Sequence, residues 1–122
     1  MKQSSVVLLQ SDARVTQSLI HSFANRTYSL HSARSLDELR NSIIREHADV
    51  VVLDMEMAPI SEVENLSHRF PKMRIICTHR LADEKMWTTA LGAGAADVVP
   101  SSDTRSILAA VTGTPLSHTA AA

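Results

Sequence analysis

A short apolar run, VVVL at residues 50–53, ends abruptly in the carboxylate Asp54, and a second carboxylate, Glu56, follows two residues later. A continuous run of branched aliphatic residues is typical of a strand that is buried on both faces, as the strands of a parallel sheet are. Such a sheet carries helices on both of its faces. The run therefore predicts an α/β fold, and it raises the question of what Asp54 does at the end of a buried strand.

Short apolar runs alternate with segments of helical spacing along the chain, a pattern typical of strand–helix units around a parallel sheet. We expect five strands, at residues 6–9, 27–32, 49–53, 74–77 and 97–99. Five such units in 122 residues predict one domain with one core. The predicted architecture is a flavodoxin-like, doubly wound, five-stranded parallel sheet with the strand order 2-1-3-4-5 and helices on both faces.

Capping signals mark where several of the helices begin. Asp12 is placed to cap the first helix, and the S-x-x-E spacing at 35–38 and 61–64 predicts capping boxes for the second and third. Pro71 closes the third helix, Gly92 and Gly94 end the fourth at 82–91, and the last helix is expected at 103–111. The expected apolar faces of the first two helices are Val15, Leu19, Ile20 and Phe23, and Leu36, Leu39, Ile43 and Ile44.

Composition excludes several classes of function. The formal charge is −1, and no basic cluster is interleaved with aromatic residues, so direct nucleic-acid binding is not expected. No apolar run is long enough to span a bilayer, no signal peptide is visible, and Cys77 is the single cysteine, which together favour a soluble cytoplasmic protein. The six histidines lack paired metal-ligand spacing, and no G-x-S-x-G motif occurs, so an enzyme is not expected.

The end of the chain differs from the rest. Residues 112–122, TGTPLSHTAAA, are small and polar and show no periodicity. We therefore assign residues 1–111 to the domain and interpret 112–122 as a flexible tail or the start of a linker.

In a doubly wound sheet of this strand order, ligands bind beyond the carboxyl ends of the first and third strands. Asp54 ends the third strand, and Gln10, Ser11 and Asp12 follow the first. These side chains are expected to meet in one crevice.

Three features resemble the receiver domain of response regulators, the signalling proteins of two-component phosphorelays. They are Asp54 after VVVL, Thr78 at the end of RIICT, and the segment ALGAGAADVV before the fifth strand. The resemblance covers nearly the whole chain. It implies that Asp54 accepts a phosphoryl group from a histidine kinase and that the hydroxyl of Thr78 bonds the phosphoryl oxygens.

The sequence departs from that family at specific positions. The acidic pair that holds Mg²⁺ in the family falls on Gln10 and Ser11, and Asp12 lies one residue too late. The lysine that pairs with the phosphoryl group falls on Ser101, and the aromatic residue that reorients on activation falls on Val98. We therefore expect a degenerate receiver in which Asp54 alone offers weak Mg²⁺ binding, with no other cofactor.

Simpler interpretations stand beside these roles. Asp12 is either a helix cap or a substitute metal ligand, and Glu56 is either solvated or able to turn toward a metal. His79 and Arg80 are either ordinary exposed loop residues or a source of positive charge near the crevice.

Two functions follow from the sequence. The first is an atypical receiver that acts through protein–protein interaction with a histidine kinase or a downstream effector domain. A homodimer through the fourth and fifth strand–helix units belongs to this hypothesis, because Met86, Trp87 and Ile107 are candidates for partial exposure there. Core packing of Met86 and Trp87 is equally open, since adjacent helical residues cannot both face inward.

The alternative function is a working phosphoacceptor modified at Asp54 with the help of substitute groups. Whether an output domain follows residue 122 stays open.

Overall fold

The computed structural model describes residues 4–24, 28–81 and 83–113. Within these ranges the five strands are β1 (Ser4–Leu9), β2 (Tyr28–Ala33), β3 (Val50–Asp54), β4 (Arg74–His79) and β5 (Asp97–Pro100). The helices are α1 (Ala13–Phe23), α2 (Leu36–Glu46), α3 (Ile60–Arg69), α4 (Glu84–Ala93) and α5 (Thr104–Thr112). All strand pairs are parallel, and the order β2-β1-β3-β4-β5 confirms the predicted topology.

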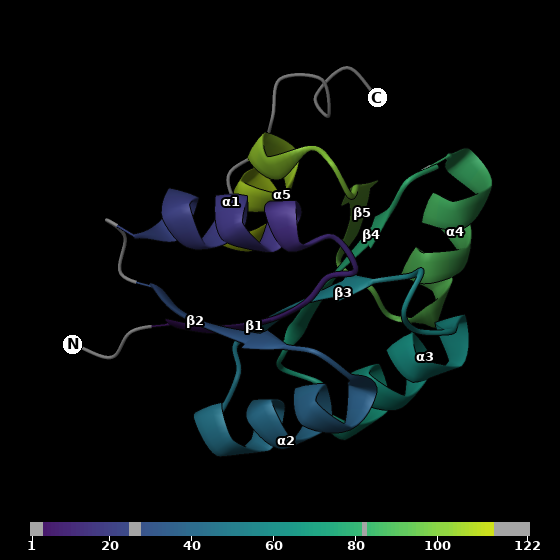
Figure 1. Cartoon of the computed structure of the whole chain (residues 1–122). Helices are drawn as coiled ribbons and strands as arrows, with labels where there is room; N and C mark the ends of the chain where they lie inside the picture. Colours follow the sequence, from purple (N-terminus) through teal and green to yellow (C-terminus); the bar gives the residue numbers. More distant parts are fainter. Residues whose placement is uncertain (1–3, 25–27, 82, 114–122) are drawn as a thin grey trace.

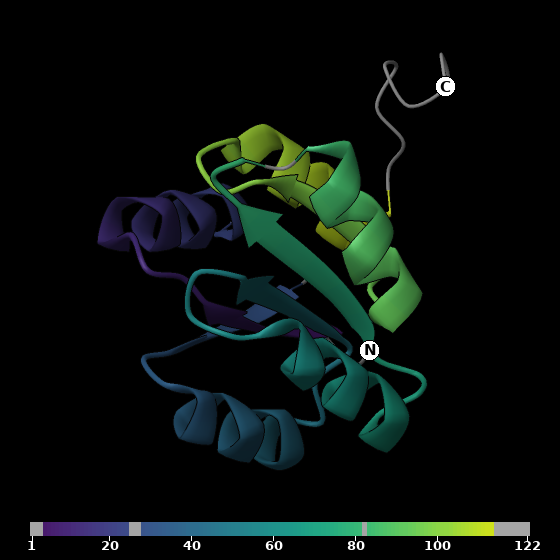
Figure 2. The same cartoon turned by 90° about the vertical axis from the view of Figure 1, so that its right-hand side faces the viewer.

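The helices form two layers around the sheet: α1 and α5 cover one face, and α2, α3 and α4 cover the other (Figures 1 and 2). Successive side chains of a strand point to opposite faces. Val6 and Leu8 therefore pack with the helices α1 and α5, whereas Val7 and Leu9 pack with α2, α3 and α4. The two layers explain why the central strands are apolar without interruption.

Two helix caps agree with their sequence signals. The carboxylate of Asp12 accepts a hydrogen bond from the backbone N–H of Arg14, and the hydroxyl of Ser35 accepts one from Glu38 N–H. The carboxylate of Glu38 bonds the N–H of Arg34 instead of that of Ser35. The capping box at 35–38 therefore forms with its return bond shifted by one residue.

Several predicted boundaries are wrong for local reasons. The capping box at 61–64 does not form, because Pro59 already holds the extended cap conformation and α3 begins at Ile60 without a side-chain cap. Gly92 lies within α4, which ends only where Gly94 adopts φ +115°. Asp83 caps the start of α4, and residue 82, the expected start, lies outside the described residues.

Three of the burial predictions are also wrong. Ile20 and Ile44 are 40% and 53% exposed, while their neighbours Leu19 and Ile43 are buried. Adjacent helical residues point about 100° apart, so only one of each pair faces the sheet. Ile107, a candidate for partial exposure, is fully buried between α5 and the sheet.

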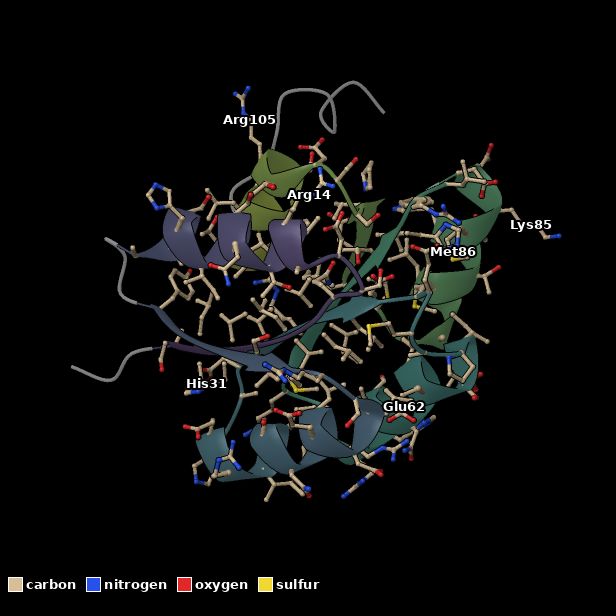
Figure 3. All side chains as sticks on the ribbon, in the orientation of Figure 1. Arg14, His31, Glu62, Lys85, Met86 and Arg105 are labelled. Carbon is tan, nitrogen blue, oxygen red and sulfur yellow. The ribbon has the colours of Figure 1, made fainter. Side chains whose placement is uncertain are left out.

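Ion pairs and close packing tie the helices together. The carboxylate of Glu62, which lies where α3 approaches α2 (Figure 3), is buried and accepts hydrogen bonds from Nη2 and Nε of Arg40 over 2.6 and 3.1 Å. These bonds raise the pKa of the Arg40 guanidinium. The backbone of Gly94, at the end of α4, lies directly against the side chain of Ser67 in α3. These contacts join α3 to both of its neighbours, α2 and α4, in the layer that covers this face of the sheet.

The last helix ends in an ordered cap. Thr112, which we assigned to the tail, is the last residue of α5, and Gly113 follows in the left-handed conformation. The guanidinium of Arg74 donates to the carbonyl oxygens of Ala110 and Val111, which satisfies the end of this helix from β4. Residues 114–122 of the predicted tail lie outside the described residues. Within the described ranges no helix is long and apolar enough to cross a membrane.

Candidate functional site

A pocket of about 520 Å³ opens beyond the carboxyl ends of the central strands. It lies where the loops after β1 and β3 meet the loops after β4 and β5. Its lining residues are Gln10, Ser11, Asp12, Val15, Asp54, Glu56, Arg80, Ser101 and Ser102. The structure therefore brings together the residues that the sequence placed in one crevice.

Asp54 is almost completely buried, with 1% of its surface exposed. Its Oδ2 atom accepts two hydrogen bonds from Ser11, one from the hydroxyl over 2.6 Å and one from the backbone N–H over 2.8 Å. Its Oδ1 atom accepts a third, from the N–H of Glu56 over 2.9 Å. Both carboxylate oxygens are thus held by donors of the protein itself, which is how a buried carboxylate is normally satisfied.

Thr78 lies beside Asp54, since the two residues pair across β3 and β4. It is fully buried, and its hydroxyl donates to Oε1 of Gln10 over 3.3 Å. The amide nitrogen of Gln10 is buried and has no hydrogen-bond partner in the described part of the chain. Gln10 therefore links the ends of β1 and β4 and leaves one buried donor free next to the pocket.

The remaining acidic side chains of the pocket are engaged elsewhere. Asp12 caps α1, as one of its two interpretations held. Glu56 is exposed, as one of its two interpretations held, and it also forms an ion pair with Arg80, in which Nε of Arg80 lies 2.7 Å from Oε1 of Glu56. The sequence did not predict this ion pair, because the two residues lie far apart in the chain and meet only where the loops after β3 and β4 run side by side.

Positive charge in the pocket comes from Arg80 alone among the described residues. The side chain of Arg80 is 77% exposed, in agreement with its interpretation as an ordinary loop residue, and it pairs with Glu56. His79 does not line the pocket, and its Nδ1 accepts a local hydrogen bond from the N–H of Leu81. Ser101, at the family's lysine position, is buried, lines the pocket and donates its N–H to the carbonyl of His79.

The residues present do not fit a preformed Mg²⁺ site. Mg²⁺ requires octahedral oxygen ligation that includes one or two available carboxylates. Both oxygens of Asp54 already accept hydrogen bonds, and the carboxylate of Asp12 bonds the first turn of α1. No group of three or more His, Cys, Asp or Glu side chains able to hold a metal ion occurs in residues 4–24, 28–81 and 83–113.

Sequence reasoning missed the role of Ser11. The sequence predicted that Ser11 lies in the crevice with Asp54, but not that its hydroxyl donates the shortest hydrogen bond to that carboxylate. The signal that points to this contact is the position of Ser11 two residues after a strand that neighbours β3. Val98, at the family's aromatic position, is buried in the core on the side of the sheet that α2, α3 and α4 cover.

Several solved structures that share this architecture are response regulators. A response regulator from Thermotoga maritima superposes with a TM-score of 0.83 at 15% identity, covering 92% of this chain and 97% of the other. The receiver domain of a Francisella response regulator gives 0.80 at 18% identity, covering 92% and 96%. The fold is that of receiver domains. A response regulator from Burkholderia pseudomallei, solved with a phosphorylated aspartic acid, a calcium ion and citrate, gives 0.76 at 20% identity over 88% of this chain.

The likeness lies in the receiver fold and not in the sequence. This chain spans 66% of the Burkholderia protein. No protein-family model matches the sequence, and no curated protein matches it either. The identities of 15 to 20% leave the function to be argued from the pocket itself.

Proposed function

We propose that this chain is an atypical receiver of two-component signalling that acts through protein–protein contacts, with little or no Mg²⁺-dependent phosphorylation. The observation that carries this proposal is the pair of hydrogen bonds from Ser11 to Oδ2 of Asp54. They satisfy with neutral donors a carboxylate that, in a working receiver, would face a metal ion. The proposal assigns the chain no enzymatic activity.

The charges of the pocket support this proposal. Phosphoryl transfer depends on positioning and on neutralisation of the charge that develops on the equatorial oxygens. In this pocket the basic side chain of Arg80 is already paired with Glu56, and Ser101 stands at the lysine position. An incoming phosphoryl group would therefore meet the carboxylates of Asp54, Glu56 and Asp12 without a free cation.

The partner is expected to be a histidine kinase or an effector domain, and a second copy of the chain is a further candidate. The side chain of Trp87, on α4, is 47% exposed, and Leu81 just before that helix is 71% exposed. Met86, by contrast, packs inward against the core (Figure 3). Large exposed apolar side chains are favoured contacts in protein interfaces, so we propose that homodimerisation uses the fourth and fifth strand–helix units.

The deciding experiment is intact-mass analysis after incubation with acetyl phosphate, with and without Mg²⁺. We expect no stoichiometric phosphoryl adduct on the wild-type chain in either condition. The double variant Gln10→Asp/Ser11→Asp restores the acidic pair and should gain an adduct only with Mg²⁺. The triple variant that adds Asp54→Ala is the matched control and should gain none. Circular dichroism checks that each variant is folded. A stoichiometric wild-type adduct that Asp54→Ala abolishes would overturn the proposal.

The Glu56–Arg80 ion pair favours a second candidate function, a working phosphoacceptor. A carboxylate oxygen of Asp54 would attack the phosphorus of a phosphohistidine, forming the O–P bond while the N–P bond breaks and the imidazole leaves and takes up a proton. Arg80 would leave Glu56 and neutralise the phosphoryl oxygens, and Thr78 would bond one of them. Under this function, Arg80→Ala should slow formation of the adduct at least about tenfold, and Glu56→Gln should accelerate it.

A further inference from the structure

A second cavity, of about 550 Å³, lies at the opposite end of the sheet from Asp54. It is formed between the carboxyl ends of α2 and α3 and the segments that lead into β3 and β4. Asp49 precedes β3 on this side, whereas Asp54 ends the same strand at the pocket described above. The two sites therefore share the central strand but no lining residue.

The floor of this cavity, which we call the basal groove, is apolar. Ile43 and Met73 form its buried part, with 2% and 8% of their surfaces exposed. Phe70 is half-buried, and Ile44 exposes 53% of its surface at the edge of the groove. An isoleucine this exposed beside a groove offers apolar area that a bound partner could remove from water.

The rim of the basal groove is positively charged. Arg69 and Lys72 are exposed, and within the described residues neither lies in ion-pair distance of a carboxylate. The guanidinium of Arg69 stacks on the ring of Phe70, 5.3 Å from its centroid, which holds this charge over the apolar floor. The single carboxylate of the lining, Asp49, accepts a hydrogen bond from the N–H of Ser5 over 2.9 Å.

We propose that the basal groove binds an acidic peptide segment of a partner protein. Apolar side chains of the segment fill the space over Ile43, Ile44 and Phe70, and its carboxylates pair with Arg69 and Lys72. Charge complementarity selects this occupant, because the apolar floor is flanked by two cations that form no ion pair with any carboxylate of the described residues. Since the groove lies at the far end of the sheet, binding there does not require phosphorylation of Asp54.

The test uses a phage-displayed library of random peptides selected against the whole chain. We expect the recovered peptides to be enriched in Asp and Glu around a large apolar residue. Synthetic copies should bind the double variant Arg69→Glu/Lys72→Glu at least about tenfold more weakly than the wild type. Ile44→Ser should also weaken binding, and Asp54→Ala should leave it unchanged.

The matched control is the double variant Lys85→Glu/Arg105→Glu. It reverses two charges on α4 and α5, where both side chains project into solvent away from the groove (Figure 3). This variant should bind within about twofold of the wild type. Recovery of peptides without acidic enrichment, or equal binding to both double variants, would overturn the proposal. Binding to anionic phosphatidylglycerol vesicles with the same residue dependence, in place of peptides, would overturn it in favour of a lipid surface.

Discussion

The hydroxyl of Ser11 donates a hydrogen bond to Asp54 over 2.6 Å, and the backbone N–H of the same residue donates another to the same oxygen over 2.8 Å. The loop after β1 thus holds the end of β3 in place through one carboxylate. The contact couples the candidate phosphoacceptor to the stability of the fold.

Ser11→Ala should therefore destabilise the chain. The variant removes one donor from a buried carboxylate while the backbone bond remains, so we expect the free energy of unfolding to fall by about 1–2 kcal/mol. Urea denaturation followed by circular dichroism measures the change. Ser102→Ala, at an exposed position of the same pocket, is the control and should change stability by less than about 0.5 kcal/mol. Equal losses in both variants would argue against a special role for Ser11.

Gly94→Ala should be strongly destabilising, whereas Gly92→Ala should not. A Cβ atom at Gly94 would lie 2.2 Å from Oγ of Ser67 and 2.6 Å from its Cβ, and the backbone there has φ +115°. We expect a loss of about 2–4 kcal/mol in the free energy of unfolding. A Cβ at the helical Gly92 meets nothing within 4 Å, so alanine should stabilise α4 by up to about 1 kcal/mol. Thermal denaturation of the two variants side by side checks the pair.

Trp87→Ala should weaken self-association without weakening the fold. The side chain is 47% exposed, so its removal should change the free energy of unfolding by less than about 1 kcal/mol. Sedimentation velocity over a range of protein concentrations measures the association. Ile20→Ala, an exposed apolar residue on α1 (40%), is the matched control. A wild-type chain that stays monomeric throughout, or a loss of association equal in both variants, would exclude α4 as the contact.

Asp103 should make the stability depend on pH in the acid range. Hydrogen bonds from the hydroxyl and the N–H of Ser106 hold the pKa of this carboxyl below its ordinary value. Its contribution is therefore present above the pKa of the unfolded chain and disappears as the pH falls through the folded pKa, below about pH 4. Asp103→Ala should cost about 1 kcal/mol at neutral pH through loss of the α5 cap.

Urea denaturation of both chains from neutral pH to about pH 3 checks this expectation. The difference between them should shrink as the pH falls. Asp103→Asn keeps a capping oxygen without the charge, so its difference from the wild type should be smaller at neutral pH. A difference that stays constant over the whole range would show that the charge of Asp103 contributes nothing.

The sequence by itself determined the sheet, its strand order and the crevice. Apolar runs such as residues 50–53 leave a strand no stable place except between two helical layers, and short strand–helix units then permit few topologies. The position of Asp54 at the mouth of the sheet follows from the same pattern. The Asp12 and Ser35 caps were also predictable, because a cap bonds residues two or three positions away.

Only the tertiary structure decided which groups surround Asp54 and which residues of each helix face the solvent. Ser11 reaches Asp54 from 43 residues away, and Glu56 meets Arg80 across two neighbouring loops. Such contacts depend on loop paths and side-chain directions that no local pattern encodes. The exposure of Ile44 and the burial of Ile107 likewise depend on how each helix is rotated against the sheet. The spacing of apolar residues defines a helix face about 100° wide. Packing against the sheet then decides which residues of that face are buried.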